Sequence, residues 1–288
     1  MRVATSPEEL GTADRAVALG TFDGVHVGHR RVIEAALAAG LQAAVVTFDP
    51  HPRTALGNRV DLIATLERRL ELIGELGVGE TLVVPFTPDL SLLTPAEFAR
   101  SVLEPLGTRV VACGVNFRFG RGRSGDVTTL ERLGFETRPV PLVEGVSSSR
   151  IRQLIASGEV SRAAKLLGRP AEVEGTVVAG DARGGTLGFP TANLAVPSEL
   201  LVPAFGIYAG QALGRRAATS IGVNPHYGGE ERRVEAFLLD YAGDLYGRRL
   251  IVELWERLRD ERAFDSEQEL IDQIGRDVDA TRAAVRPV

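Results

Sequence analysis

The first half of the chain alternates short apolar runs with stretches that carry apolar residues at helical spacing. The runs cover residues 15–22, 42–49, 80–86, 108–115 and 136–143, and the helical stretches cover 27–40, 66–77 and 95–107. Apolar residues at every third or fourth position predict amphipathic helices, whereas short apolar runs between turn residues predict buried strands. Their alternation predicts a parallel sheet with helices on its faces, in which sites form at the carboxyl ends of the strands.

The pattern changes after Gly168, Arg169 and Pro170. Two helical stretches, 148–156 and 160–167, precede this point. After it, strand-like runs are separated by glycine-containing turns, at 172–180, 206–213, 216–223, 232–240 and 249–258. These runs predict an antiparallel barrel or sandwich of about six strands. An amphipathic helix from Ser266 to about Val285 follows. We therefore expect two domains, residues 1–168 and 169–288.

The composition excludes several classes of protein. No run approaches the 18 apolar residues that indicate a transmembrane helix, and the first residues lack the apolar stretch of a signal peptide. Cys113 is the only cysteine, and its apolar neighbours predict a buried thiol. Lys165 is the only lysine, so the phosphate-binding motif G-x-x-x-x-G-K-S/T is absent. The net charge of −5 gives no sign of a nucleic-acid surface. We expect a cytoplasmic protein without nucleic-acid or membrane partners.

The densest functional signal is GTFDGVHVGH, residues 20–29. It leads from a predicted strand through a glycine-containing turn into a helix that begins near Val27. His26 and His29 are three residues apart, so both can face one side, beside a helix N-terminus that favours phosphate. Two imidazoles there can donate hydrogen bonds to a phosphate in a transition state. The alternatives for this pattern are half of a zinc site and an accidental surface turn.

This segment resembles the HxGH signature of the nucleotidyltransferase superfamily. The longer string is similar to the N-terminal module of bacterial bifunctional riboflavin kinase/FAD synthetases. The similarity continues at residues 48–52 (FDPHP), 114–120 (GVNFRFG) and 147–152 (SSSRIR). The resemblance implies that His26, His29 and Arg152 are catalytic. It further implies that nucleotide or flavin is bound by the other motif residues, which are Gly20, Phe22, Asp23, Gly24, His51, Asn116, Ser148 and Ser149.

The SSSRIR motif departs slightly from the family pattern, because Ser149 stands where threonine is common. Serine keeps the hydroxyl, so we expect activity to be retained. Without the family, the same residues predict a helix start with serines at the N-cap, and such a start is itself an anion site. The implied reaction is attack of the FMN phosphate on the α-phosphorus of ATP, with pyrophosphate leaving. Alignment and charge stabilisation would supply the catalysis.

A second group of functional residues lies in the strand-rich part. Residues 180–193 contain several glycines and end in LGFPTAN. A glycine-rich backbone can wrap phosphates, although an ordinary hairpin is the alternative. The segment resembles the PTAN motif of riboflavin kinases, which implies that Thr191 and Asn193 hold Mg²⁺ and ATP phosphates. The resemblance also implies nucleotide or flavin binding by Gly180, Gly188 and Asn224. Gly185 and His226 depart from the family pattern.

Glu235 is the one charged residue in a predicted apolar strand segment, VEAFLL. In the riboflavin kinase family the matching glutamate is the catalytic base for the ribityl 5′-hydroxyl. A carboxylate suits this role, because the proton need only move as the new P–O bond forms. A strand glutamate facing solvent is the alternative.

The sequence as a whole predicts an α/β, Rossmann-like nucleotidyltransferase domain of the HxGH type, followed by an antiparallel β-barrel riboflavin kinase domain with a terminal helix. The predicted function is phosphorylation of riboflavin to FMN and adenylylation of FMN to FAD, with Mg²⁺ as cofactor and riboflavin, FMN and ATP as small-molecule substrates. One alternative is an enzyme that keeps only one activity, and another is a flavin- or nucleotide-binding regulatory protein. The presence of both sets of predicted catalytic residues argues against both alternatives. The oligomeric state is not predicted.

Overall fold

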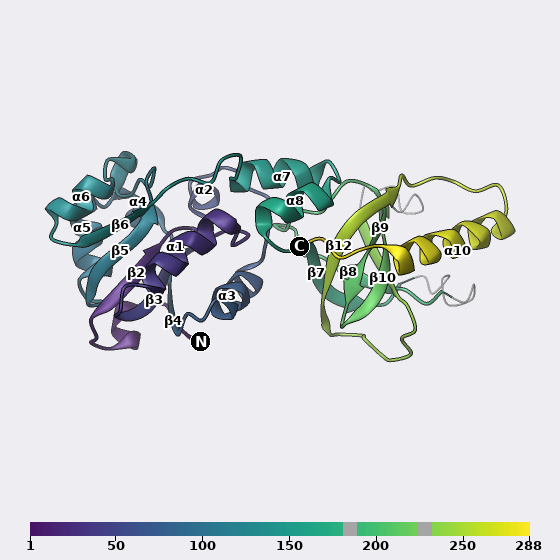
Figure 1. The fold of residues 1–288 in the computed structure, drawn as a ribbon, viewed down its shortest axis with the longest axis horizontal. Coiled ribbons are helices and arrows are strands. Elements are labelled where there is room, and N and C mark those ends of the chain that lie inside the picture. The colour runs from purple at the N-terminus through teal and green to yellow at the C-terminus, as the bar shows by residue number, and fades with distance from the viewer. Residues whose placement is uncertain (181–188, 224–231) are drawn as a thin grey trace. The chain divides into compact units, whose positions relative to one another are not determined.

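The computed structural model describes residues 1–180, 189–223 and 232–288 (Figure 1). The chain forms two compact units. The first unit comprises residues 1–60 and 64–148, and the second comprises residues 61–63 and 149–288. Within the described ranges, no helix is long and apolar enough to cross a membrane.

A six-stranded sheet forms the centre of the first unit, and each pair of neighbouring strands is parallel. The order across the sheet is β1-β4-β3-β2-β5-β6. The strands are β1 (Arg2–Ala4), β2 (Arg15–Leu19), β3 (Gln42–Asp49), β4 (Glu80–Pro85), β5 (Thr108–Gly114) and β6 (Glu136–Val140). The parallel sheet predicted from the sequence is confirmed. Only β1 was missed, because three residues show no readable period.

Helices cover both faces of this sheet (Figure 1). On one face, α1 (Val27–Leu37) and α3 (Leu66–Glu75) bury Ile33 and Ile73 against strand residues such as Ala18. The other face is covered by α5 (Pro95–Phe98), the π-helical turn η2 (Ala99–Leu103) and α6 (Val127–Arg132). Burial on both faces explains the unbroken apolar runs at residues 16–19 of β2 and 43–46 of β3. The remaining short helices are η1 (Pro7–Leu10), α2 (Pro52–Ala55), α4 (Pro88–Leu92) and η3 (Arg121–Arg123).

The sequence predicted a single helix over residues 95–107, and the structure differs there. After α5 the chain widens into η2, with the Glu104 amide donating to the Ala99 carbonyl at 2.9 Å. Helical structure ends at Leu103, two residues before Pro105, which has no amide hydrogen with which to continue the ladder.

The strands of the second unit close into a barrel in the order β10-β11-β8-β7-β12-β9, and all pairs are antiparallel. They are β7 (Ala171–Val178), β8 (Ala192–Ala195), β9 (Gly206–Ala212), β10 (Arg215–Val223), β11 (Arg232–Leu238) and β12 (Arg249–Arg259). The predicted barrel is therefore confirmed, and the sandwich left open by the pattern is wrong. Strand β8 was not recognised as a strand, because it has only four residues.

Among the residues that the structure describes, three helices accompany the barrel. The helices α7 (Ser148–Ala156) and α8 (Val160–Leu167) have the bounds predicted from the sequence. From Ser149 onward they belong to the second unit, and α8 packs on β7 and β12. The terminal helix α10 (Glu267–Ala283) is capped by Ser266 and packs on β9 and β10. An ion pair of 2.7 Å between Arg259 Nη2 and Asp277 Oδ2 joins α10 to β12.

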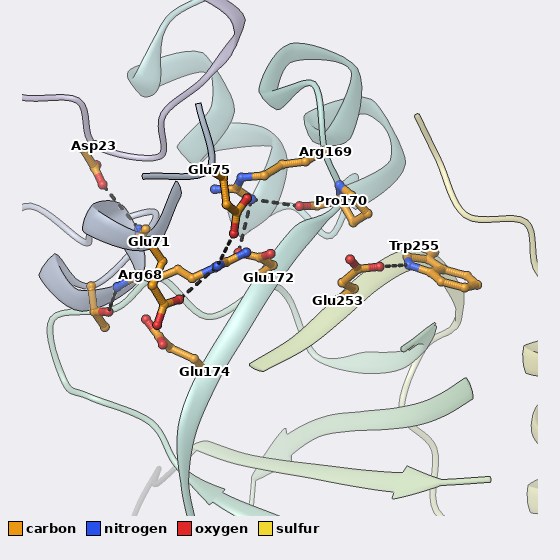
Figure 2. Close-up of polar contacts among 12 residues, drawn as sticks. Asp23, Arg68, Glu71, Glu75, Arg169, Pro170, Glu172, Glu174, Glu253 and Trp255 are labelled. Atoms are coloured by element: carbon orange, nitrogen blue, oxygen red, sulfur yellow. Dashed lines mark hydrogen bonds and ion pairs between the residues drawn. The ribbon is translucent and has the colours of Figure 1, made fainter. Parts of the chain in front are cut away.

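Polar contacts near the surface add little to these cores. Arg68 Nη1 lies 2.9 Å from Glu71 Oε2 and 3.1 Å from Glu75 Oε1 on the same helix (Figure 2). In the second unit, Trp255 Nε1 donates to Glu253 Oε2 at 2.8 Å. Such local contacts supplement the buried apolar side chains, which are the main source of stability in each unit.

The single thiol gives a direct test of the first core. Cys113 lies on β5 with 0% exposure, and burial raises its pKa to about 11. At pH 8 an unfolded cysteine is about a quarter ionised, whereas the buried thiol stays protonated. We expect a thiol reagent such as DTNB to label the native protein at least about 10²-fold more slowly than the urea-unfolded protein. Similar rates in the two states would contradict the placement of β5.

Candidate active sites

Three of the predicted motif loops leave neighbouring strands at the same edge of the parallel sheet. Residues 20–26 follow β2, His51 follows β3, and Asn116 follows β5. In the sheet, β2 lies between β3 and β5. Along the chain, β3 and β4 follow β2 and lie on one side of it in the sheet, whereas β5 and β6 come next and lie on its other side. The boundary between β2 and β5 is therefore the topological switch point, where open α/β sheets bind ligands.

The turn after β2 has an unusual backbone. Phe22 (φ 54°) and Val25 (φ 38°) are non-glycine residues in the left-handed region, and Gly24 (φ 79°) lies between them. Both Phe22 and Val25 are 1% exposed. Left-handed residues without glycine cost about 1–3 kcal/mol each and persist only where the surroundings hold them. Such strain is common at functional sites, and here the turn leads directly into His26.

Contacts from other segments hold this turn. Asp23 is 2% exposed, and its Oδ1 accepts a hydrogen bond from the Ala64 amide at 3.3 Å (Figure 2). The Asp23 carbonyl accepts from Ser148 Oγ at 3.1 Å, at the first residue of α7. Gly20 fits closely against Phe22, because a Cβ on Gly20 would lie 3.0 Å from the Phe22 ring and the ring would have to shift. The structure thus brings four predicted residues together: Gly20, Phe22, Asp23 and Ser148.

The two histidines stack at the start of α1. Their ring centroids are 3.5 Å apart with an interplanar angle of 14°, and the His29 ring meets Phe22 edge-on at 5.3 Å. His26 is the N-cap, and its Nδ1 accepts from the His29 amide at 3.2 Å. An accepting Nδ1 places the ring proton on Nε2, which can then donate to a ligand.

The other predicted residues of this group are placed as follows. His51 is the N-cap of α2, and its Nδ1 accepts from the Arg53 amide at 3.2 Å. Asn116 is exposed just after β5, with its Oδ1 beside Gly114. Ser149 is exposed, and Arg152 donates from Nε to the Asp61 carbonyl at 2.9 Å. Arg152 and Ser149 belong to the second unit.

Sequence reasoning missed Arg69, which is 3% exposed on α3 and donates to carbonyls at the ends of β2 and β3. In the sequence it is one of two adjacent arginines in an amphipathic helix, a pattern typical of a solvated face. The one sequence feature that could have indicated a role for Arg69 is its position in the first turn of a helix that follows two of the motif segments.

The close fit of Gly28 against His26 generates a prediction. A Cβ on Gly28 would lie 3.1 Å from His26 Cε1, so the ring would have to shift. We expect Gly28→Ala to lower the rate of FMN adenylylation at least about 10-fold, because a small displacement of a group that contacts the reacting atoms slows the reaction strongly. The rate of riboflavin phosphorylation by the same variant is the internal control, and it should equal the wild-type rate because Gly28 lies outside the barrel.

The matched control is Gly74→Ala on α3, where the nearest atom to an added Cβ is 3.7 Å away. It should leave both reactions unchanged and raise stability by up to about 0.5–1 kcal/mol, because alanine favours a helix over glycine. Equal adenylylation rates in the Gly28 variant and the wild type would contradict the role given to the His26 ring.

Two residues of the second predicted group, Glu235 and Asn193, lie on the outer face of the barrel. In the strand register, Glu235 of β11 is directly opposite Asn193 of β8 and Ser220 of β10. Directly opposed residues project to the same face of a sheet, so these three side chains line up across three strands. The buried neighbours Val234 and Ala236 face the barrel interior instead. Ser220 was not singled out in the sequence, because only the register reveals it.

Two cavities meet at Thr191. One, of about 350 Å³, is lined by Glu235, Ser220 and Phe237 of the outer face and by Leu270 and Ile274 of α10. The other, of about 410 Å³, is lined by the inward-facing Ala236 and Leu238 and by Tyr241 and Tyr246. Thr191 lines both cavities.

The residues around Asn193 suit an ATP-bound magnesium ion. A Cβ on Gly180 would overlap the Asn193 amide group, so the glycine allows this close approach. Among the described residues, no group of three or more His, Cys, Asp or Glu side chains could hold a metal ion. The Thr191 hydroxyl and the Asn193 carbonyl are neutral oxygen donors, of the kind that complete the shell of Mg²⁺ held chiefly by phosphates and water. Gly188 and Asn224, also predicted as binding residues, lie outside the described residues.

A histidine pair at the switch point of a parallel sheet, followed by a barrel with adjoining cavities, defines a two-domain, nucleotide-dependent transferase. Comparison with known families agrees: the FAD synthetase model matches residues 9–152, and the riboflavin kinase model matches residues 167–285. The chain belongs to the bifunctional riboflavin kinase/FMN adenylyltransferase family. The family, the fold and the class of enzyme predicted from the sequence are therefore confirmed.

Similar proteins cover nearly the whole chain. A bifunctional riboflavin kinase/FMN adenylyltransferase from Listeria monocytogenes is 35% identical, over 96% of this chain and 94% of that protein. The protein of the same name from Escherichia coli is 36% identical, over 90% of this chain and 89% of that protein. A crystal structure described as a macrolide-efflux protein from Streptococcus pneumoniae has a TM-score of 0.87 and 33% identity, covering 97% of this chain and 98% of that one. Its name differs from those of the two relatives above, and its similarity shows the fold.

Proposed function

We propose that the chain phosphorylates riboflavin to FMN in the barrel and adenylylates FMN to FAD in the parallel-sheet domain, with ATP as donor in both reactions. The proposed domains are residues 1–168 and 169–288. The observation that carries the proposal is Thr191, which lines two adjoining cavities, one of which also contains Glu235. A phosphoryl donor in one cavity and an acceptor in the other would meet beside this hydroxyl.

In the kinase reaction, Glu235 is proposed to accept the proton of the ribityl 5′-hydroxyl as that oxygen bonds to the γ-phosphorus of ATP and ADP leaves. Arg233 Nη1 lies 3.7 Å from Glu235 Oε1 and orients the carboxylate electrostatically. Thr191 and Asn193 would hold the metal and phosphates, with Gly180, Gly188 and Asn224 contacting nucleotide or flavin. Mg²⁺, when bound, would neutralise charge on the transferred phosphoryl group.

In the adenylyl transfer, an FMN phosphate oxygen would bond to the α-phosphorus of ATP while pyrophosphate leaves. The stacked pair His26 and His29 would donate to phosphate oxygens beside the N-terminus of α1, where the helix dipole adds positive potential. The proposed nucleotide or flavin contacts are Gly20, Phe22, Asp23, Gly24, His51, Asn116, Ser148 and Ser149. Arg152, one turn into α7, is proposed as a further phosphate ligand of this reaction.

The Glu235 assignment can be tested by Glu235→Gln. Glutamine keeps the size of the side chain but cannot accept the ribityl proton at neutral pH, so riboflavin phosphorylation should fall by roughly 10²–10⁴. FAD formation from supplied FMN should survive, because that reaction is assigned to the other domain. The measurement is chromatographic separation of riboflavin, FMN and FAD after incubation with Mg-ATP.

The control is Glu256→Gln, an exposed glutamate on β12, which should change neither reaction. Wild-type kinase turnover in a folded Glu235→Gln protein would contradict the role of Glu235 as the base and would indicate a strand residue that only faces solvent. Wild-type protein that forms neither product would favour a flavin- or nucleotide-binding regulatory protein, and one product alone would indicate a single retained activity.

Separation of the domains gives a second test. Leu154, Ile155, Val160 and Leu167 of α7 and α8 are buried in the core of the second unit. A fragment without α7 and α8 loses these four buried side chains, and burial of each contributes about 1.5–3 kcal/mol to the free energy of unfolding. We expect fragments 149–288 and 169–288 both to form FMN, with the longer melting at least about 10 °C higher by circular dichroism. A folded 169–288 fragment without kinase activity would show that the kinase site needs the preceding residues.

Riboflavin, FMN and ATP are the proposed partners, and we propose a cytoplasmic location without nucleic-acid or membrane partners. The formal charge of −5 is consistent with the absence of a nucleic-acid surface.

A further inference from the structure

The guanidinium of Arg69 links the ends of two strands of the parallel sheet. Its Nη1 donates to the Thr21 carbonyl at 3.0 Å, just after β2, and its Nη2 donates to the Phe48 carbonyl at 3.1 Å, near the end of β3. Nη2 also lies 3.5 Å from Asp49 Oδ1. One side chain thus contacts the backbone at the start of two predicted ligand-binding segments, 20–26 and 48–52.

The Arg69 charge is buried but compensated. Burial lowers the pKa of the Arg69 guanidinium, and the nearby carboxylates Asp23 and Asp49 act in the opposite direction. An arginine keeps its charge in such surroundings, because its ordinary pKa is far above neutral. The two carboxylates and two carbonyls replace part of the water that the guanidinium loses, while the buried Nε has no hydrogen-bond partner among the described residues.

One of the two carbonyls that Arg69 contacts, that of Thr21, directly precedes the left-handed residues of the turn. The Thr21 carbonyl accepts a second hydrogen bond from Thr47 Oγ1 at 2.9 Å, so both of its lone pairs are used. Phe22, the next residue, is left-handed, and the following Asp23 is bound to the Ala64 amide just ahead of α3. The start of α3 therefore holds the turn at two points, Thr21 and Asp23.

We propose that Arg69 is a positioning residue for adenylyl transfer, which fixes the backbone of residues 21–25 so that His26 and His29 meet the reacting phosphate. This inference rests on the role proposed for the two histidines. Arginine suits the task because its planar fork can serve two carbonyls at once, whereas a lysine ammonium on a flexible stem cannot fix both in one geometry.

The experiment compares Arg69→Lys and Arg69→Met with Arg109→Met, in the full-length protein. Arg109 is an exposed arginine at the opposite end of β5, paired with Asp14 at 2.8 Å. For Arg69→Met we expect kcat of FMN adenylylation to fall about 10²-fold, and for Arg69→Lys about 10-fold, with the KM values for FMN and ATP within about threefold of wild type. Riboflavin phosphorylation should be unchanged, and Arg109→Met should resemble the wild type.

Folding and positioning are measured separately. The fraction of Cys113 protected from DTNB reports the folded first unit, and kcat is expressed per folded molecule. If Arg69→Met fails to fold, Arg69→Lys decides the question. Amide hydrogen exchange of residues 21–26 should be at least about 10-fold faster in Arg69→Lys than in the wild type. Wild-type kcat together with wild-type exchange in Arg69→Lys would overturn the proposal.

His29→Ala distinguishes this proposal from the one on which it rests. If His29→Ala keeps full FAD synthesis, the assignment of the histidines fails. If His29→Ala loses FAD synthesis by about 10²-fold or more while Arg69→Lys remains as active as wild type, only the role of Arg69 fails.

Discussion

The parallel pairing of β2 with β3 and β5 is the interaction on which the first site depends. Because all three strands end at one edge, motifs separated by up to about a hundred residues in the sequence are delivered to the same place. The same pairing requires both faces of the sheet to be covered, which α1 and α3 do on one side. It also leaves the carbonyls at the strand ends without further sheet partners, and Arg69 binds two of them.

The second site depends on the alternation of side chains along β11. Val234, Ala236 and Leu238 face the barrel core, while Glu235 and Phe237 face outward toward the cavity beside α10. One face of β11 thus packs in the apolar core, and its other face places the proposed catalytic carboxylate in the cavity. Closure of the barrel fixes the register that places Asn193 and Ser220 beside Glu235.

Much of the fold was predictable because its signals are local. Strand β3 and the helices α7 and α8 have the predicted bounds, since their apolar patterns end at turn or capping residues. Strands β1 and β8 were missed, because three or four residues are too short to show a period. The sequence also identified the motif residues around His26 and Glu235. It could not show that Arg69 is buried or that Ser220 faces Glu235, because both facts follow from pairing between distant segments.

Thr191 lies at the edge between two cavities, and this arrangement bears on the order of events in the barrel. One cavity is lined by the segment 241–246 and by inward-facing residues of β11, and the other by outward-facing residues of the same strand and by α10. An occupant of one therefore takes no volume from the other, and neither has to enter first for steric reasons.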